Sequence, residues 1–146
     1  MTNNVDNYFE QPSSGSDNKL VIGGSFETAG GGSLKKIYLT VDMTDVSTAS
    51  TVYLPSPVAG TITGIQTIIN GDIATADAVI TGKIADVEIT GGVITIDFAS
   101  SGLGIVDSAT PTDNNTVAVG SNINFSTDGA STNTVRATII VEITLS

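Results

Sequence analysis

The sequence predicts an all-β fold, an antiparallel β-sandwich of the jelly-roll kind that follows an extended N-terminal arm. Three observations lead to this prediction. Short runs of alternating apolar and polar residues recur along the chain, and turn signals separate them at intervals of about ten residues. Aliphatic residues, Thr and Gly are abundant, whereas Leu, Lys, Glu and Arg, the usual helix formers, are scarce. Convincing helical periodicity is absent throughout.

A change of composition near residue 34 divides the chain into an arm, residues 1–34, and a domain, residues 35–146. The first 19 residues of the arm are rich in Asn, Ser and Asp, and such a segment cannot bury enough apolar surface to order itself. The domain is long enough to bury a core, which must be aliphatic because aromatic residues make up only 5% of the chain and Trp is absent.

The arm holds the apolar residues that we take as candidates for contact with a partner. Two adjacent aromatic residues either fold back onto the domain or dock on a partner, because aromatic side chains supply large contact area at interfaces. Two glycine-rich units follow between residues 20 and 34. They are either a flexible linker or short extended segments that stack against the same segments of neighbouring subunits. The candidates are Tyr8, Phe9, Pro12, Leu20, Val21, Ile22 and Phe26.

The first half of the domain contains three predicted strands. Residues 36–43 alternate, and the short strand at residues 51–54 ends at Pro55-Ser56-Pro57, which cannot lie in a central strand. Residues 60–69 form a longer strand whose phase shifts near Gly64, and this shift predicts a β-bulge. The residues expected to face inward are Ile37, Leu39, Val41, Met43, Ile62, Ile65, Thr67 and Ile69.

The middle of the domain is predicted to contain two further strands. Residues 76–85 place Ala78, Ile80 and Gly82 on one face. The overlapping segment 72–80 is the one place where a helical turn would be tolerated. Residues 86–90 are a short strand or a turn before Gly91-Gly92. Residues 93–98 form a strand that places Ile94, Ile96 and Phe98 together.

The last part of the domain begins with a predicted loop over residues 99–116, which contains several turn signals. An apolar patch at residues 117–119 precedes a strand at residues 122–127. Residues 134–145 alternate strictly, with Ile140 the one apolar residue on the polar side. A strand of this length needs partners on both flanks, and we therefore place it inside a sheet.

Charge and composition exclude several classes of function. The chain has fifteen acidic residues and five basic ones. Five basic residues cannot supply the clustered cations that binding to a duplex nucleic acid or an anionic membrane requires. The chain has no Cys and no His, which excludes thiolate nucleophiles, thiolate zinc sites and imidazole bases. The opening residues do not resemble a secretory signal, and no apolar window reaches the length of a membrane span. We expect a protein that is not an enzyme and needs no cofactor.

The acidic residues offer two weak candidates for chemistry. Asp86 and Glu88 lie two apart, as paired carboxylates for glycoside hydrolysis could, but a solvated face explains them better. Several loop aspartates could supply oxygen ligands for calcium, although none lies in an EF-hand frame. The glycine pairs of the arm lack the following Lys and helix of a phosphate-binding loop. The loop aspartates are Asp72, Asp77, Asp107, Asp113 and Asp128.

Several blocks of the chain, in the right order, resemble the capsid decoration proteins of tailed bacteriophages, also called cement or head-fibre proteins. The likeness covers most of the chain and includes the opening Y-F-E-Q-P and the V-I-G-G segment, which resemble the N-terminal arms of that family. The domain blocks are L-T-V-D-M-T-D-V-S-T-A-S-T-V-Y-L-P-S-P-V-A-G-T-I-T (39–63), I-N-G-D-I-A-T-A-D-A-V-I-T (69–81), V-D-S-A-T-P-T-D-N-N-T-V-A-V-G (106–120) and T-D-G-A-S-T-N-T-V-R-A-T (127–138).

The resemblance implies a structural virion component that is made in the host cytoplasm and binds the outer surface of the capsid, commonly as a trimer. The expected partners are then the major capsid protein and further copies of this chain, with no nucleic acid and no membrane. The arm would bind the capsid, and the domain would trimerise through outward apolar residues on its strands, for which we nominate Val79 and Ile140. The competing interpretation is an adhesion module that binds a glycan or a host surface, because fold does not determine function.

Overall fold

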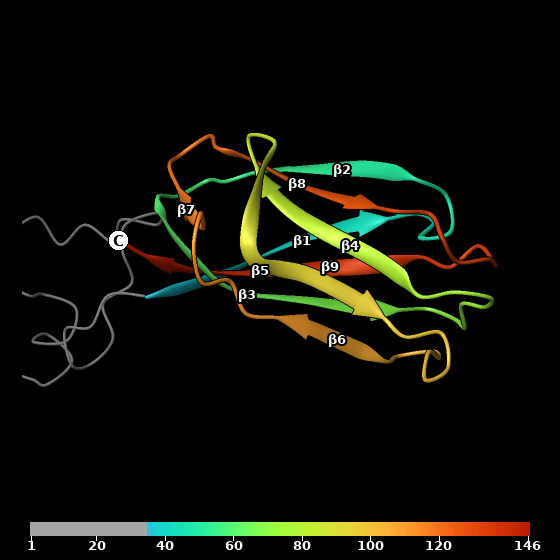
Figure 1. Ribbon diagram of the computed structural model, residues 1–146. Helices are drawn as coiled ribbons and strands as arrows, with labels where there is room; N and C mark the ends of the chain where they lie inside the picture. Colours follow the sequence, from blue (N-terminus) through green and yellow to red (C-terminus); the bar gives the residue numbers. More distant parts are fainter. Residues whose placement is uncertain (1–34) are drawn as a thin grey trace, which may run out of the picture. The chain divides into compact units, whose positions relative to one another are not determined.

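The computed structural model describes residues 35–146, and within this range the chain forms nine β-strands and no helix (Figure 1). The strands are β1 (Lys36–Met43), β2 (Ser50–Pro55), β3 (Gly60–Ile69), β4 (Ala78–Ile84), β5 (Val87–Ile96), β6 (Val106–Ala109), β7 (Thr116–Val117), β8 (Asn122–Thr127) and β9 (Ala137–Leu145). The division of the chain into an arm and a domain stays a prediction.

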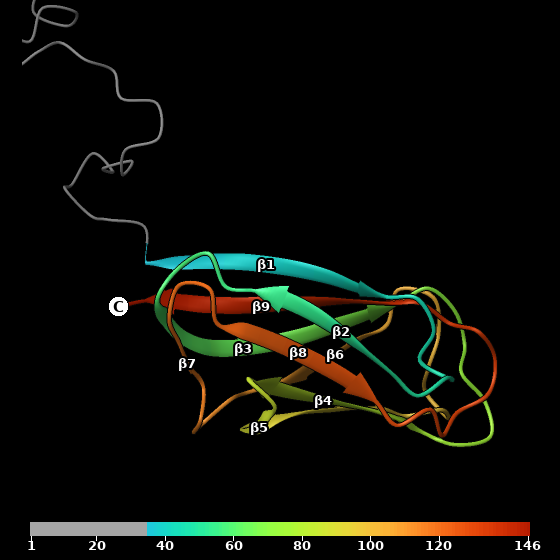
Figure 2. The same cartoon turned by 90° about the horizontal axis from the view of Figure 1, so that it is seen from above.

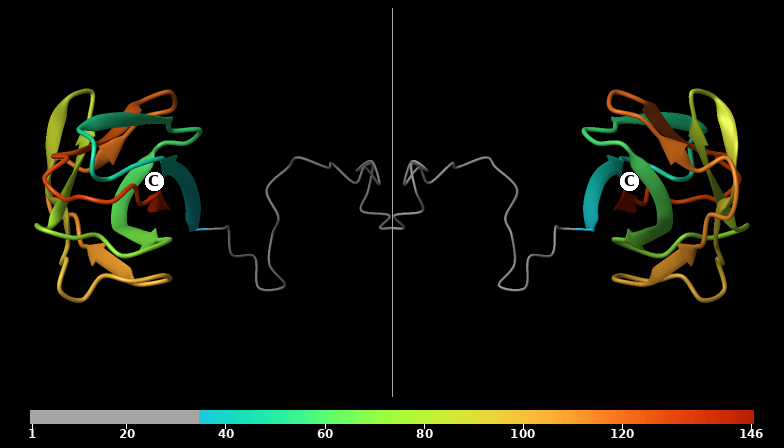
Figure 3. Two further views of the ribbon diagram at one scale, coloured as in Figure 1. Left: turned by 90° about the vertical axis from the view of Figure 1, so that its right-hand side faces the viewer. Right: turned by 90° about the vertical axis from the view of Figure 1, so that its left-hand side faces the viewer.

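The strands form two antiparallel sheets. Sheet A has the order β1-β9-β3-β6, with the short β7 also paired to β3, and sheet B has the order β2-β8-β4-β5. Every connection between the long strands crosses from one sheet to the other, except the β4–β5 hairpin. This topology confirms the predicted jelly roll. Figure 2 shows β1, β9 and β3 in one layer and β4 and β5 in the other, and the end views in Figure 3 show the sheets curving around a common interior.

The central strand of sheet A is β9, which pairs with β1 on one side and β3 on the other. Its alternation leaves Ala137, Ile139, Val141 and Ile143 buried, as predicted. The regular ladder begins at Ala137, three residues later than expected. Val135 is nevertheless buried, and its carbonyl accepts a hydrogen bond from the backbone N–H of Val46 at 2.9 Å outside the ladder.

The predicted β-bulge in β3 is present. The register between β3 and β9 shifts between Ile62 and Gly64, and the inward side therefore changes from Ile62 to Ile65, Thr67 and Ile69. Likewise β2 ends at Pro55 and lies at the edge of sheet B, where a strand can end without breaking a ladder on both sides.

Strand β5 corrects the interpretation of residues 86–98. The hairpin turn lies at Ala85 and Asp86, both of which have positive φ, and β5 continues through the glycine pair that was expected to follow a strand or turn. Figure 1 shows β5 bending strongly along its length. The strand ends at Ile96, and Phe98 is exposed in the following turn instead of joining Ile94 and Ile96 in the core.

One further prediction was wrong. Residues 99–116 are not all loop, because residues 106–109 form β6 at the edge of sheet A. No apolar alternation marks this strand, which pairs with β3 on one side alone. The segment 72–80 has no helical turn: Ala74 bridges to Thr132 of another loop, and β4 begins at Ala78.

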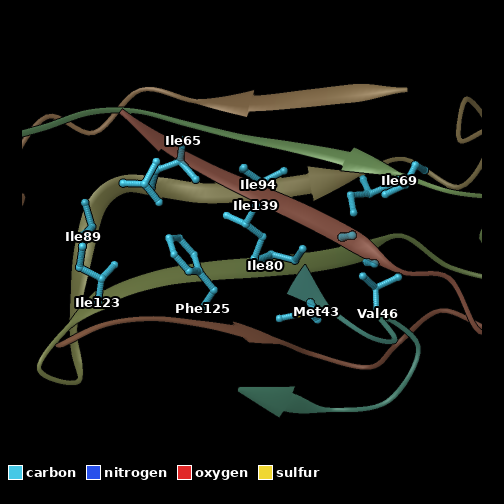
Figure 4. Packing of buried hydrophobic residues seen from close by; sticks show 14 of the residues in the cluster. Met43, Val46, Ile65, Ile69, Ile80, Ile89, Ile94, Ile123, Phe125 and Ile139 are labelled. Atoms are coloured by element: carbon cyan, nitrogen blue, oxygen red, sulfur yellow. The ribbon is translucent and has the colours of Figure 1, made fainter. Parts of the chain in front are cut away.

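The core lies between the two sheets and is built from Ile, Val, Ala and Met around one aromatic ring, Phe125 (Figure 4). Burial of these side chains stabilises the fold by about 25 cal/mol for each Å² of apolar surface removed from water, and it is the main stabilising contribution. The predicted aliphatic core is confirmed within residues 35–146. The residues that Figure 4 labels are Met43, Val46, Ile65, Ile69, Ile80, Ile89, Ile94, Ile123, Phe125 and Ile139.

Candidate interaction surfaces

The candidate capsid-binding residues of the arm all precede Lys35 and lie outside the described residues. The chain enters the domain beside its own C-terminal strand, because the backbone N–H of Leu145 donates to the carbonyl of Lys35 at 2.8 Å. Strands β1, β3, β5 and β8 run away from the end where Lys35 and Leu145 lie. The loops that follow them therefore lie together at the opposite end of the sandwich, and they comprise residues 44–49, 70–77, 97–105 and 128–136.

The two nominated subunit contacts point outward, but they lie on opposite faces of the domain. Ile140 is half-buried on the outer face of sheet A, between Thr40 of β1 and Gln66 of β3. Val79 is half-buried on the outer face of sheet B, beside Thr95 of β5. The structure therefore does not bring them together within one subunit.

The outer face of sheet A is hollowed around Ile140. The hollow has a volume of about 340 Å³ and is lined by residues of β1, β9, β3 and β6. It exists because β3 has no side chain at Gly64, where a methyl group would meet only the Cβ of Glu142 at 3.6 Å. The other side chains around it come from Tyr38, Gln66, Ser108 and Thr110.

Glu142 is the most strongly perturbed acid of the domain. It accepts hydrogen bonds from Lys36 Nζ at 2.8 Å, Thr63 Oγ1 at 2.7 Å and Tyr38 Oη at 2.9 Å. These contacts, with Lys36 the largest contributor, lower the pKa of Glu142 from 4.5 to about 2. Because Glu142 stays ionised and holds three donors, it cannot act as a general acid near neutral pH, and it fixes the Tyr38 ring at the edge of the hollow.

Three of the acids that might have carried chemistry, Asp77, Asp86 and Asp128, accept hydrogen bonds at or beside turns instead, whereas Asp107 lies on strand β6. Asp86 lies in the β4–β5 turn and accepts from Asn124 Nδ2 at 3.1 Å, whereas Glu88 is exposed on β5. Asp77 accepts from the backbone N–H of Phe98 at 3.0 Å. Asp128 accepts from those of Val79 at 3.1 Å and Ala130 at 3.2 Å. Such bonds satisfy loop backbone groups and explain acidic loops without a ligand.

No group of three or more acidic side chains in residues 35–146 is placed to hold a metal ion. Over the same residues, the structure has no helix long and apolar enough to cross a membrane.

An exposed apolar patch was missed in the sequence. It comprises Ile68 of β3, Val106 at the start of β6, and Leu103 and Ile105 in the loop before β6, and Leu103 is 79% exposed. Ile68 and Val106 are directly paired across the two strands. The signal was present in the sequence as three large apolar residues within a segment read as loop. Because the strand there was not recognised, its pairing with β3 was not foreseen.

Both tyrosines of the domain lie on strands that the sequence predicts, and both are exposed. Tyr38 is 62% exposed on β1 and Tyr53 is 60% exposed on β2. Exposed aromatic rings are the feature that an adhesion module would use, and of the two only Tyr38 borders the hollow on sheet A.

Comparison with known proteins finds a likeness in structure alone. No family model matches the chain, and no curated protein matches it. A chain in the acid-stable capsid structure of Helicobacter pylori bacteriophage KHP30 is 15% identical with a TM-score of 0.51, over 77% of this chain and 89% of that chain. A chain from the structure of Bacillus endospore appendages, which form disulfide-linked pili, is 17% identical over 76% of this chain and 88% of that chain. Its TM-score of 0.34 is too low to carry an argument. The first likeness establishes a shared fold.

Proposed function

We propose that this protein is a structural virion component that decorates the outer surface of a bacteriophage capsid and stabilises the shell. The observation that carries the proposal is the jelly roll, which matches a chain of a phage capsid structure over nearly all of that chain. The chemistry of residues 35–146 supports it as well. Glu142 is held ionised by its three donors, and the loop acids Asp77 and Asp128 accept hydrogen bonds from backbone N–H groups.

The arm attaches the protein to the major capsid protein in this proposal. A polar segment with a few apolar anchors makes weak single contacts, and several arms in one oligomer raise the effective concentration once the first has docked. Sedimentation with capsids that lack the protein tests this. We expect removal of residues 1–34 to abolish co-sedimentation, and the full chain with Tyr8→Ser and Phe9→Ser to bind more weakly.

Thermal unfolding of the truncated domain is the control, because it must still melt cooperatively for the loss of binding to count. Full-strength attachment by the intact domain alone would refute the role of the arm. Full-strength attachment by the doubly substituted chain would exclude these two aromatic residues as anchors.

Assembly into a trimer is the second part of the proposal. Val79 and Ile140 lie on opposite outer faces, and a cyclic trimer can use both if sheet A of one copy meets sheet B of the next. We expect Ile140→Lys and Val79→Lys each to lower the mass measured by light scattering. Val87→Lys changes an exposed apolar residue in the β4–β5 hairpin and is the matched control. An unchanged trimer in both test variants would exclude this contact.

The second candidate function is glycan binding, which the exposed Tyr38 beside a polar hollow favours. The ring offers a flat apolar face for a sugar ring, and Gln66, Ser108 and Glu142 offer polar groups beside it. This use of the hollow competes with a subunit contact at Ile140. Titration with neutral malto-, cello- and chito-oligosaccharides, followed by NMR, distinguishes them. Saturable shifts at Gly64 and Gln66 that Tyr38→Ala removes and Tyr53→Ala retains would favour the glycan.

A further inference from the structure

Two neighbouring polar side chains at the β3–β6 edge of sheet A, Thr67 and the partly buried Asp107, each have a buried oxygen without a hydrogen-bond partner. Thr67 of β3 and Asp107 of β6 are directly opposite in the antiparallel register. Thr67 belongs to the inward row of β3 together with Ile65 and Ile69 and is fully buried. Its Oγ1 and the Oδ2 of Asp107 are both sealed from water, and neither has a hydrogen-bond partner within residues 35–146. Buried polar atoms are nearly always paired, and this pair therefore requires an explanation.

The surroundings of Asp107 disfavour its charged form. Strands β3 and β5 pack against β6, and β3 carries no charged residue. On β5 the charged residue is Glu88, and Asp97 follows the end of that strand. Burial, and then the negative charge of Asp97, raise the pKa of Asp107. Burial and the charge of Asp97 therefore both disfavour a carboxylate at Asp107.

We propose that Asp107 and Thr67 form a proton-dependent lock that fastens β6 to the edge of sheet A. In the locked state a proton from solvent neutralises the Asp107 carboxyl, whose O–H donates to Oγ1 of Thr67. Opposite residues in an antiparallel pair have Cβ atoms about 5 Å apart, within reach of such a bond after a small side-chain rotation. Loss of the proton leaves a charge that one neutral hydroxyl does not compensate.

The position of β6 makes the lock consequential. The strand has four residues and is paired with β3 on one side alone, so its attachment depends on few contacts. It also carries Val106, which belongs to the exposed apolar patch beside Ile68. Release of β6 at higher pH would therefore loosen this patch and expose the edge of β3.

The expected pH dependence follows from the direction of the shift. A carboxyl whose pKa is raised by folding binds its proton more tightly in the folded state. Stability is then gained as the pH falls through the folded pKa, and the gain is complete below the pKa of an unfolded Asp. Above the folded pKa, the charged Asp107 weakens the fold.

The test is urea unfolding of the full chain at about pH 4 and about pH 7, where the charge of Asp107 should differ. The wild type is compared with Asp107→Asn, Thr67→Val and, as a control on β5, Glu88→Gln. We expect Asp107→Asn to match or exceed the wild type at the higher pH and to lose that advantage in acid. Thr67→Val should reduce the gain of the wild type in acid, and Glu88→Gln should preserve it.

Two direct measurements keep the proposal testable if a variant folds poorly. Carbon NMR of the wild type should place the Asp107 pKa above that of Asp in an unfolded peptide. Hydrogen exchange, corrected for intrinsic rates, should show greater protection of the β6 amides in acid. A normal or lowered pKa, or β6 protection and variant differences that do not depend on pH, would overturn the lock.

Discussion

Two of the glycine sites within the strands of this domain differ in what surrounds them. Gly64 lies at the bulge of β3, where an added methyl group would meet only Glu142 Cβ at 3.6 Å, an ordinary contact. Gly91 and Gly92 lie inside β5, where the register against β4 shifts opposite Gly82. Gly91 has a φ of 74°, and its added methyl group would lie 2.5 Å from the carbonyl oxygen of Thr110.

The comparison separates two reasons for glycine in a strand. At Gly64 the absent side chain leaves space on the outer face, and the bulge itself changes which residues of β3 face the core. At Gly91 and Gly92 the backbone bends sharply and another segment packs against it, since Thr90 bridges to Asp113 beside the bend. The first glycine shapes a surface, whereas the second pair allows two parts of the backbone to meet.

Gly91→Ala should cause the largest loss of stability. The left-handed conformation costs about 1–2 kcal/mol for a residue with a side chain, and the clash with the Thr110 carbonyl adds a similar amount. We expect a loss of about 3 kcal/mol, measured by urea unfolding of the full chain. A loss below about 1 kcal/mol would show that β5 does not need glycine here.

Gly92→Ala should cost less, about 1–3 kcal/mol, because the obstacle is steric. The added methyl group would lie 2.8 Å from the Cβ of Ile89, a core residue of the same strand. Substitution of Ile89 by Gly removes that Cβ. The double variant with Gly92→Ala should therefore lose less stability than the sum of the two single losses. Simple additivity in this cycle would contradict the steric explanation.

Gly64→Ala should be nearly neutral and serves as the matched control for both, with an expected change within about 1 kcal/mol. The residue has no positive φ, and the reduced freedom of the unfolded chain favours Ala by about 0.4–1 kcal/mol where the native conformation allows it. Its unfolding midpoint should stay close to that of the wild type. A loss as large as that of Gly91→Ala would remove the distinction between the two sites.

Thr63→Val should have the smallest effect on stability but a clear effect on titration. Thr63 lies beside the bulge and donates to Glu142, so its removal should raise the pKa of Glu142 from about 2. Because folding lowers this pKa, the stability from Glu142 is complete above 4.5 and is lost as the pH falls toward 2. Carbon NMR of Glu142 should therefore titrate at a higher pH in Thr63→Val. An unchanged titration would exclude Thr63 as a contributor.

Much of the fold could be predicted because alternation is a local property. The strand at 36–43 was placed with its observed bounds, and the bulge at Gly64 follows from a phase shift that needs no knowledge of neighbours. The bend of β5 was misread, because a glycine pair is a turn signal locally and becomes a bend only when other strands hold both sides. Strand β6 was missed because its four residues are extended mainly through pairing with β3.

The candidate surfaces were predictable to a lesser degree. The outward orientation of Val79 and Ile140 follows from alternation and agrees with the structure, although their role in a trimer stays a prediction. Their separation onto opposite faces depends on the assignment of β4 and β9 to different sheets. The hollow at Gly64 and the donors around Glu142 join residues from distant parts of the chain, and no spacing in the sequence marks them.

By itself, the sequence determined that this domain is a sandwich of short aliphatic strands, because a period of two decides locally which side chains face a core. Only the tertiary structure decided which strands lie side by side. That choice places Asp107 opposite Thr67, opens the hollow beside Tyr38 and gathers the apolar patch at Leu103. The physical reason is that alternation specifies the face of a residue, whereas its neighbours depend on how the whole chain folds back on itself.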